Sequence, residues 1–193
     1  MALTLKTPPA VEPVSTAEMR QQLRLDTNEE DELLSTLITA AREYCEGFQN
    51  RAYITQVWEL TLDDFPRSTI DLPKGSLQRV DVVAYRDAAG GTTTLTHNTD
   101  YIYSVRGLLG RLMPAYGKSW PGFIRYPMDA VTIEFTCGYG DTAAAVPEKT
   151  RQAIKLLAAH WFMNREGVLV GSISKELEFA VSALLWMDRI VPV

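Results

Sequence analysis

The sequence contains little cysteine and little histidine. Its 193 residues include two cysteines, Cys45 and Cys137, and two histidines, His97 and His160. No CxxC pair and no Cys/His spacing typical of a zinc module occurs. The scarcity argues against a disulfide framework and favours a reducing compartment. We therefore expect no metal site and no cofactor.

Long apolar runs and runs of basic residues are also missing. No uninterrupted apolar stretch approaches the ~20 residues that span a bilayer. The first ten residues, "MALTLKTPPA", do not have the apolar core of a signal peptide. The formal net charge is −5, which argues against a strong electrostatic grip on nucleic acid. We expect no membrane association and no sequence-specific DNA binding.

What is present is the composition of an ordinary globular protein, 46% hydrophobic and 22% charged. The length predicts a single domain over residues 1–193. Within it we expect an extended, proline-bearing arm at 1–13, helices over 14–50, a β-rich insertion over 53–138 and helices over 147–190. This order predicts an α+β fold that is mainly an α-helical bundle formed by the N- and C-terminal helices, with a small antiparallel β insertion in the middle.

Local signals support these elements. Ser15 with Glu18 three residues later is a capping box that opens a short helix. Alternating apolar residues predict strands over "ITQVWELTLDDF", "LQRVDVVAYRD" and "AVTIEFTC". In the last of these, Val131, Ile133, Phe135 and Cys137 share one face. Gly138-Tyr139-Gly140 then permits a sharp exit from the strand, with φ > 0 available to glycine.

Cys137 and His160 are the one candidate catalytic pair. A thiol near a helix start, with a histidine as base, would suit a small hydrolase. Cys137, however, shares the inward parity of Phe135, and a free cysteine there behaves as a small buried hydrophobe. His160 lies more than three turns into its predicted helix. We expect no catalytic residue, and the hydrolase remains the alternative.

The last two predicted helices are apolar on two faces each. A helix that is apolar nearly all round is buried all round, either in its own core or against a neighbour. Both outcomes stay open from the sequence, and large exposed apolar patches usually mark interfaces. The residues predicted to contact another subunit or partner are Leu156, Met163, Phe179, Trp186 and Ile190, with Trp120 and Phe123 in the aromatic loop 114–127.

Four segments in fixed order resemble a known family. They are "PVSTAEMRQQLRLD", "EEDELLSTLITAAREYCEGFQNRAYITQVWELTLDDFP", "IDLPKGSLQRVDVVAYRDAAGG" and "AVTIEFTCGYGDTAAAVPEKTRQAIKLLAAHWFMNREGV". Their order and spacing, and the "GYG…VPE…LLAAHWFMNRE" block above all, are similar to the head–tail connector, or head-completion adaptor, proteins of long-tailed double-stranded-DNA phages. The similarity spans about residues 13–189.

The resemblance implies a structural virion protein and not an enzyme. Family members assemble as a homo-oligomeric ring, typically of twelve subunits, beneath the portal protein of the filled head. The ring extends the channel through which genomic DNA passes, and it offers an attachment surface to the next neck or tail-completion protein. The implied location is the head–tail junction of the virion, reached from the bacterial host cytoplasm during assembly. A different phage neck or tail-completion protein is a further alternative.

Segments that become ordered on docking are expected in such a subunit. The candidates are the arm 1–13, the loop 114–127, the connector 167–173 and the C-terminal "IVPV". The mild negative charge of the chain suits a channel that must not retain DNA.

Overall fold

The computed structural model describes residues 1–193 apart from 68, 123–125, 166–172 and 192–193. The chain divides into two compact units, each described by itself. Residues 1–9 and 55–138 form the β unit, and residues 10–54 and 139–193 form the helical unit.

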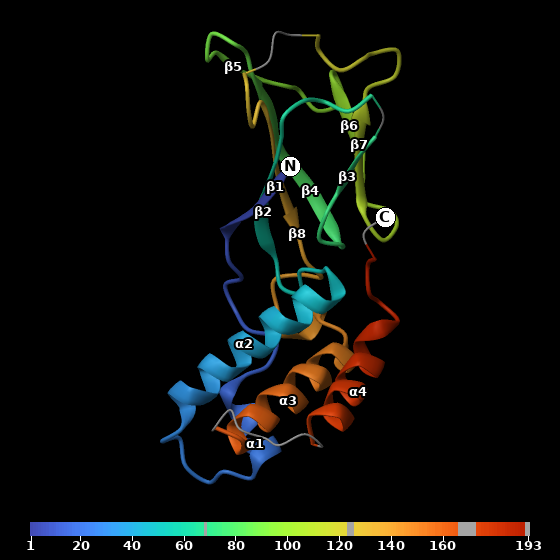
Figure 1. Ribbon diagram of the computed structural model, residues 1–193. Coiled ribbons are helices and arrows are strands. Elements are labelled where there is room, and N and C mark those ends of the chain that lie inside the picture. Colours follow the sequence, from blue (N-terminus) through green and yellow to red (C-terminus); the bar gives the residue numbers. More distant parts are fainter. Residues whose placement is uncertain (68, 123–125, 166–172, 192–193) are drawn as a thin grey trace. The chain divides into compact units, whose positions relative to one another are not determined.

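The β unit contains two antiparallel sheets (Figure 1). The first has the strand order β1-β2-β8-β4-β5 and the second has the order β3-β7-β6. In chain order the strands are β1 (Ala2–Thr7), β2 (Gln56–Leu62), β3 (Ile70–Leu72), β4 (Leu77–Arg86), β5 (Thr92–Thr94), β6 (Tyr101–Ser104), β7 (Gly110–Pro114) and β8 (Val131–Cys137). Buried side chains come from both sheets, among them Leu60, Leu72, Leu112, Ile133 and Phe135.

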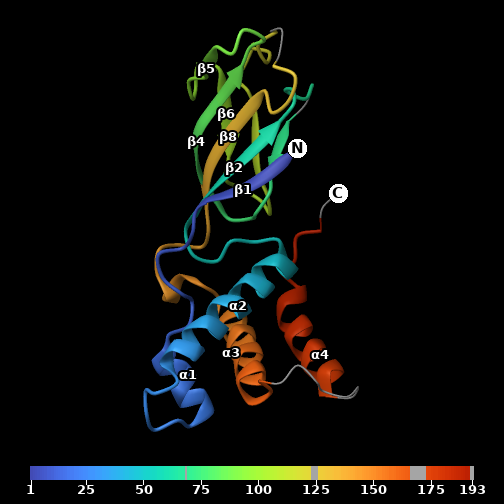
Figure 2. The ribbon, with the colours of Figure 1, turned by 60° about the vertical axis from the view of Figure 1, so that its left-hand side comes forward.

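Strand β8 lies between β2 and β4 (Figure 2). Phe135 is paired with Trp58 of β2 and with Val80 of β4. The predicted inward face is confirmed, because Val131, Ile133, Phe135 and Cys137 are all buried. Gly138 follows the strand with φ = 132°, a conformation that side chains disfavour, so glycine lets the chain leave the sheet here.

The helical unit contains α1 (Thr16–Leu23), α2 (Asp31–Gln49), a short 3₁₀ turn η1 (Ala143–Ala145), α3 (Glu148–Met163) and α4 (Ile173–Trp186). Helix α2 packs against α1, α3 and α4. One apolar core joins the four α-helices through buried residues such as Met19, Leu34, Ile38, Ile154 and Leu185.

Local sequence explains where the first two helices begin and end. The predicted capping box is confirmed: the Glu18 amide donates to Ser15 Oγ, and the Ser15 amide donates to the Glu18 carboxylate. Asp31 and Glu32 lie in the first turn of α2, where the helix dipole favours negative charge. Asn50 ends α2 in the left-handed conformation, and its amide bonds back to the last turn.

The predicted fold class is wrong. The described residues form eight strands in two antiparallel sheets beside four α-helices, so the chain is not a helical bundle with a small β insertion. Two sources of strand were overlooked. Residues 2–7, within the predicted arm 1–13, form β1 and pair with β2, although Pro8 and Pro9 follow directly. The three-residue strand β3 is too short to show a period, and its pairing with β7 defines it.

Glycine at position 110 is required by the contact between the two sheets. A Cβ atom built on Gly110 of β7 would lie 2.7 Å from the Cβ atom of Leu77 on β4, and closer still to the Cδ2 atom of that side chain. Gly110→Ala is therefore expected to destabilise the β unit by about 1–3 kcal/mol through overpacking.

Variants at Leu77 test whether this clash causes the loss of stability. Leu77→Ala alone leaves a cavity, whereas Gly110→Ala with Leu77→Ala removes the clash. The double variant should lose less stability than the sum of the two single changes, measured by urea unfolding followed through β-sheet circular dichroism. Strictly additive losses would show that the two side chains do not compete for the same space.

Candidate functional site

A buried polar network fixes the C-terminal end of α4 to the end of α2. The Gln49 side chain donates to the Leu185 carbonyl at 2.6 Å, and the Ile190 amide donates to the Gln49 carbonyl at 2.9 Å. Arg51 Nε donates to the Asp188 carbonyl at 2.6 Å. These bonds determine where the surface at the end of α4 lies.

A second buried network lies about two turns earlier in α2, around Arg42. Arg42 has a side chain only 6% exposed, and it pairs with Glu12 and with Glu46, each at 2.8 Å. Burial alone would lower the pKa of the Arg42 guanidinium, but hydrogen bonds and charges from the two carboxylates raise it. Glu46 also accepts the Tyr53 amide at 2.8 Å. The segment before α1, through Glu12, and the segment after α2, through Tyr53, are therefore both held by the Arg42–Glu46 ion pair.

An aromatic strip crosses the surface that these networks position. We define it as Tyr44 and Phe48 of α2, Trp161 of α3 and Trp186 of α4. Tyr44 meets Trp161 edge to face with ring centres 6.4 Å apart, and Phe48 meets Trp186 at 6.5 Å. Tyr44 and Phe48 are one turn apart and therefore neighbours on the helix surface.

The strip combines exposure with the side chains that interfaces favour. Tyr44 is 47% exposed and Trp186 is 61% exposed. The Arg189 guanidinium lies over the rings of Phe48 and Trp186, at 4.8 and 5.3 Å. Trp, Tyr, Met and Arg are enriched at protein interfaces and among the residues that dominate binding energy.

A shallow apolar hollow adjoins the strip. It has a volume of about 310 Å³ and is lined by Ser182, Ala183, Trp186 and Met187. Met187 is 83% exposed, and Val191 farther along is also exposed. The end of α4 therefore presents a contiguous apolar surface, which is typical of a site that contacts another protein.

The predicted contact residues occupy different surroundings. Met163 and Trp186 are exposed, whereas Leu156 is half-buried against the helical core and Ile190 is buried. Trp120 stacks on Phe65 of the β unit with ring centres 4.6 Å apart. Phe123 lies outside the described residues, as does most of the connector 167–173. Phe179 lies in α4, but its side chain is not among those described. Contact with a subunit or partner stays a prediction for all seven.

The sequence analysis did not single out three residues of the strip, Tyr44, Phe48 and Trp161. Helical spacing showed that they were apolar but could not show that they form the margin of the core. Their aromatic character was the available signal, because amphipathic rings concentrate where one side is buried and the other is wet.

The surroundings of Cys137 do not favour the hydrolase alternative. Cys137 is fully buried, between Gln56 of β2 and Leu77 of β4. A reactive thiolate requires access to its substrate, and a buried thiol lacks it. His160 is in α3, and its Nδ1 atom lies 3.3 Å from the Asn164 amide nitrogen. The described residues include no group of three or more metal-ligating side chains, and no described helix is long and apolar enough to cross a membrane.

Comparison with known proteins finds a family that resembles part of the chain. Residues 15–89, less than half of the chain, match phage gp6-like head-tail connector proteins. The predicted resemblance to head–tail connector proteins is confirmed. The connector match spans α1, α2 and strands β2, β3 and β4 of the β unit. A search of curated proteins finds no match.

Solved structures extend the likeness to the whole chain. A chain in the neck of an empty GTA particle, computed with C6 symmetry, is 28% identical, with a TM-score of 0.83 over 100% of this chain and 97% of that one. A chain in the virion of a native gene transfer agent particle is 28% identical, with a TM-score of 0.81 and the same coverage of both chains. A chain in the neck of a native GTA particle, computed with C12 symmetry, is 26% identical, with a TM-score of 0.80.

Proposed function

We propose that this chain is a structural subunit of a phage-type neck, which assembles as a closed homo-oligomeric ring at the head–tail junction of the virion. The ring docks under the portal protein, extends the DNA channel and carries the next neck or tail-completion protein. The observation that carries the proposal is the likeness to neck chains over the full length of both partners.

The symmetry of the related necks favours a ring of twelve. Those necks were computed with C6 and with C12 symmetry. A twelve-membered ring satisfies both, because its twelvefold axis contains the sixfold one. Closed rings use head-to-tail contacts between two different patches on each subunit. The aromatic strip supplies one candidate patch.

The ring is tested with the purified protein, alone and mixed with its portal protein. Native mass spectrometry and negative-stain electron microscopy should show a closed ring on the portal, with twelve copies of this chain. A protein that stays monomeric at every concentration and ignores the portal would contradict the proposal. A ring that binds only the tail side would favour the other neck or tail-completion alternative.

Trp186→Ala is expected to weaken assembly by about 30-fold or more, because a central tryptophan at an interface commonly contributes 2 kcal/mol or more. The measurement is the protein concentration at which half the chains are in rings, by sedimentation velocity. Met128→Ala is the control, since Met128 is similarly exposed, at 69%, but lies in the β unit. Unchanged helical circular dichroism confirms folding. Equal behaviour of the two variants would exclude the strip from the ring contact.

A further inference from the structure

Strand β1 forms one edge of the first sheet but buries little of its own surface. Five of its six residues are exposed, and Leu3 alone is half-buried. Its neighbour in the sheet is β2, and the antiparallel register runs from Ala2 opposite Thr61 to Leu5 opposite Trp58. A strand that is held mainly by backbone hydrogen bonds, with so little apolar burial, belongs to the parts of a fold that open at low cost.

The edge that β1 covers requires a cation. Glu59 of β2 and Glu134 of β8 lie directly opposite each other, and like charges in this arrangement destabilise a sheet. Lys6 of β1 pairs with both glutamates, and its Nζ atom lies 3.4 Å from the Glu59 carboxylate. Without β1, the edge of β2 would present free backbone groups beside two facing carboxylates. The edge therefore fits this strand, or the identical strand of another copy.

A proline-bearing joint, residues 8–11, follows β1 and is largely exposed. Pro8 and Pro9 restrict its backbone, and prolines favour an extended linker. Directly after the joint, Glu12 pairs with Arg42 at 2.8 Å, which anchors the chain on α2. The strand is thus a separate element, joined to the helical unit by a short extended segment. An element attached in this way is suited to exchange between identical copies.

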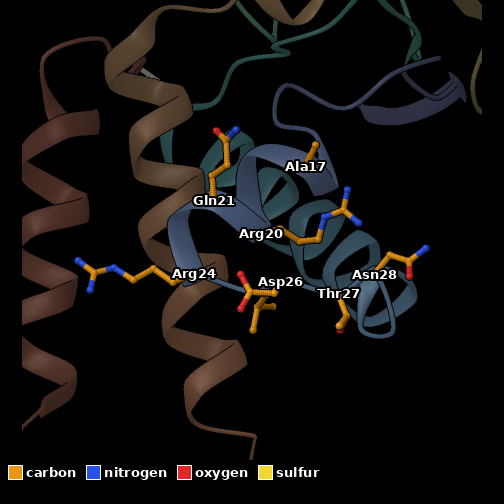
Figure 3. Close-up of a pocket in the computed structure, with 8 residues that line it drawn as sticks. Ala17, Arg20, Gln21, Arg24, Asp26, Thr27 and Asn28 are labelled. Atoms are coloured by element: carbon orange, nitrogen blue, oxygen red, sulfur yellow. The ribbon is translucent and has the colours of Figure 1, made fainter.

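The hollow beside α1 gives the strand no comparable acceptor. This hollow has a volume of about 770 Å³, and its walls come from α1 and the loop that follows. Figure 3 shows Arg20 and Arg24 extending in opposite directions, with the Asp26 side chain between them. Asp26 is the single carboxylate among the lining residues, and Arg20 already pairs with Asp31 at 3.2 Å. A helix and a loop also present no sheet edge to which a strand could add.

We propose that neighbouring copies in the ring exchange β1. The strand of one copy pairs with β2 of the next, and its Lys6 lies between the Glu59 and Glu134 carboxylates of that neighbour. Exchange repeats between copies the contacts that β1 makes within one chain, so the two surfaces are complementary by sequence identity. The donated strand and the accepting edge are two different patches, as a head-to-tail ring requires. The inference rests on the proposed ring and names a strand that joins its subunits.

A mixture of two cysteine variants tests the exchange. One chain carries Ala2→Cys and the other carries Thr61→Cys, at positions that lie opposite each other in the β1–β2 ladder. Opposed residues of an antiparallel pair are about 4.5–5.5 Å apart between Cα atoms, a distance that a disulfide can bridge. Neither chain can form this bond within itself, and the native Cys45 and Cys137 are fully buried. Oxidised rings from an equal mixture should give a disulfide-linked pair of the two chains on a non-reducing gel. A mixture with Thr92→Cys, on the exposed strand β5, in place of Thr61→Cys is the control and should give none.

A charge variant measures the contribution of the strand to assembly. Lys6→Glu places a third carboxylate beside Glu59 and Glu134, and it should weaken ring assembly about tenfold or more in sedimentation velocity. Lys118→Glu removes an exposed cation elsewhere in the β unit and should assemble normally. Circular dichroism confirms that each variant is folded. Equal assembly of the two charge variants would contradict the exchange.

The outcomes separate the exchange from the ring itself. If the unaltered protein forms no ring with its portal, the proposed function fails and the exchange fails with it. If rings form and the mixture gives no linked pair, each chain keeps its own β1, and the exchange is wrong although the ring stands. Linked pairs in equal amounts from the mixture and from its control would show unspecific oxidation and would also overturn the exchange.

Discussion

Replacing Arg42 with alanine is expected to lower the free energy of unfolding of the helical unit by about 3–5 kcal/mol. The guanidinium is nearly fully buried and neutralises Glu12 and Glu46 at the same time. Removing it takes from the Glu46 carboxylate, itself 9% exposed, the guanidinium that pairs with it at 2.8 Å. A buried charge that loses its partner cannot recover its hydration, and this cost exceeds the net value of the intact pair.

Urea unfolding followed by helical circular dichroism measures this loss. Arg165→Ala is the matched control, because Arg165 also pairs with a glutamate, Glu30 at 2.8 Å, but has a side chain 51% exposed. An exposed pair contributes about 1 kcal/mol or less. Losses of equal size in the two variants would show that burial of the Arg42 pair does not determine its contribution.

The same network connects stability with the contact proposed for the aromatic strip. The turn after Glu46 carries Phe48 and Gln49, and Gln49 holds the carbonyl of Leu185, next to Trp186. The strip is therefore built on the core of the helical unit. Variants in the network should weaken assembly only together with folding, whereas variants at Trp186 should weaken assembly alone.

The sequence predicted those features that local chemistry determines. The Ser15–Glu18 capping box and the inward parity of β8 depend on neighbouring residues, and both are confirmed. The antiparallel pairing of β4 with β5, which lies directly after Gly90-Gly91, is equally local. Periodicity and turn residues are sufficient for elements of this kind.

Features that depend on distant partners were missed. Strand β1 forms by pairing with β2, more than fifty residues later in the chain. The prolines next to β1 argued against a strand there in the sequence. Arg42 and Glu46 are charged residues beside the apolar stripe of α2, and a partner thirty residues away, Glu12, explains the burial of Arg42. Much of the strand content of the β unit depends on pairing between segments that are distant in the sequence. Counting local signals therefore underestimated the share of strand in the fold.

Alkaline solution is expected to destabilise the helical unit by up to about 4 kcal/mol through Cys45 between pH 9 and pH 12. Burial of the Cys45 thiol, with a smaller contribution from the charge of Glu46, raises its pKa from 9.0 to about 12. Above pH 9 the unfolded chain loses this proton while the folded chain keeps it. Each unit of pKa difference corresponds to 1.36 kcal/mol, so stability falls as pH rises through this window.

Cys45→Ala distinguishes this thiol from other alkaline effects. Burial also raises the pKa of the Tyr53 phenol, so some loss of stability at high pH remains in the variant. The variant starts lower at pH 7 because the smaller side chain leaves a gap in the core. Between pH 9 and pH 12, however, its unfolding free energy from urea titration with a reductant present should fall less steeply than that of the original protein. Parallel curves over this range would mean that the Cys45 thiol ionises as readily in the folded chain as in the unfolded one.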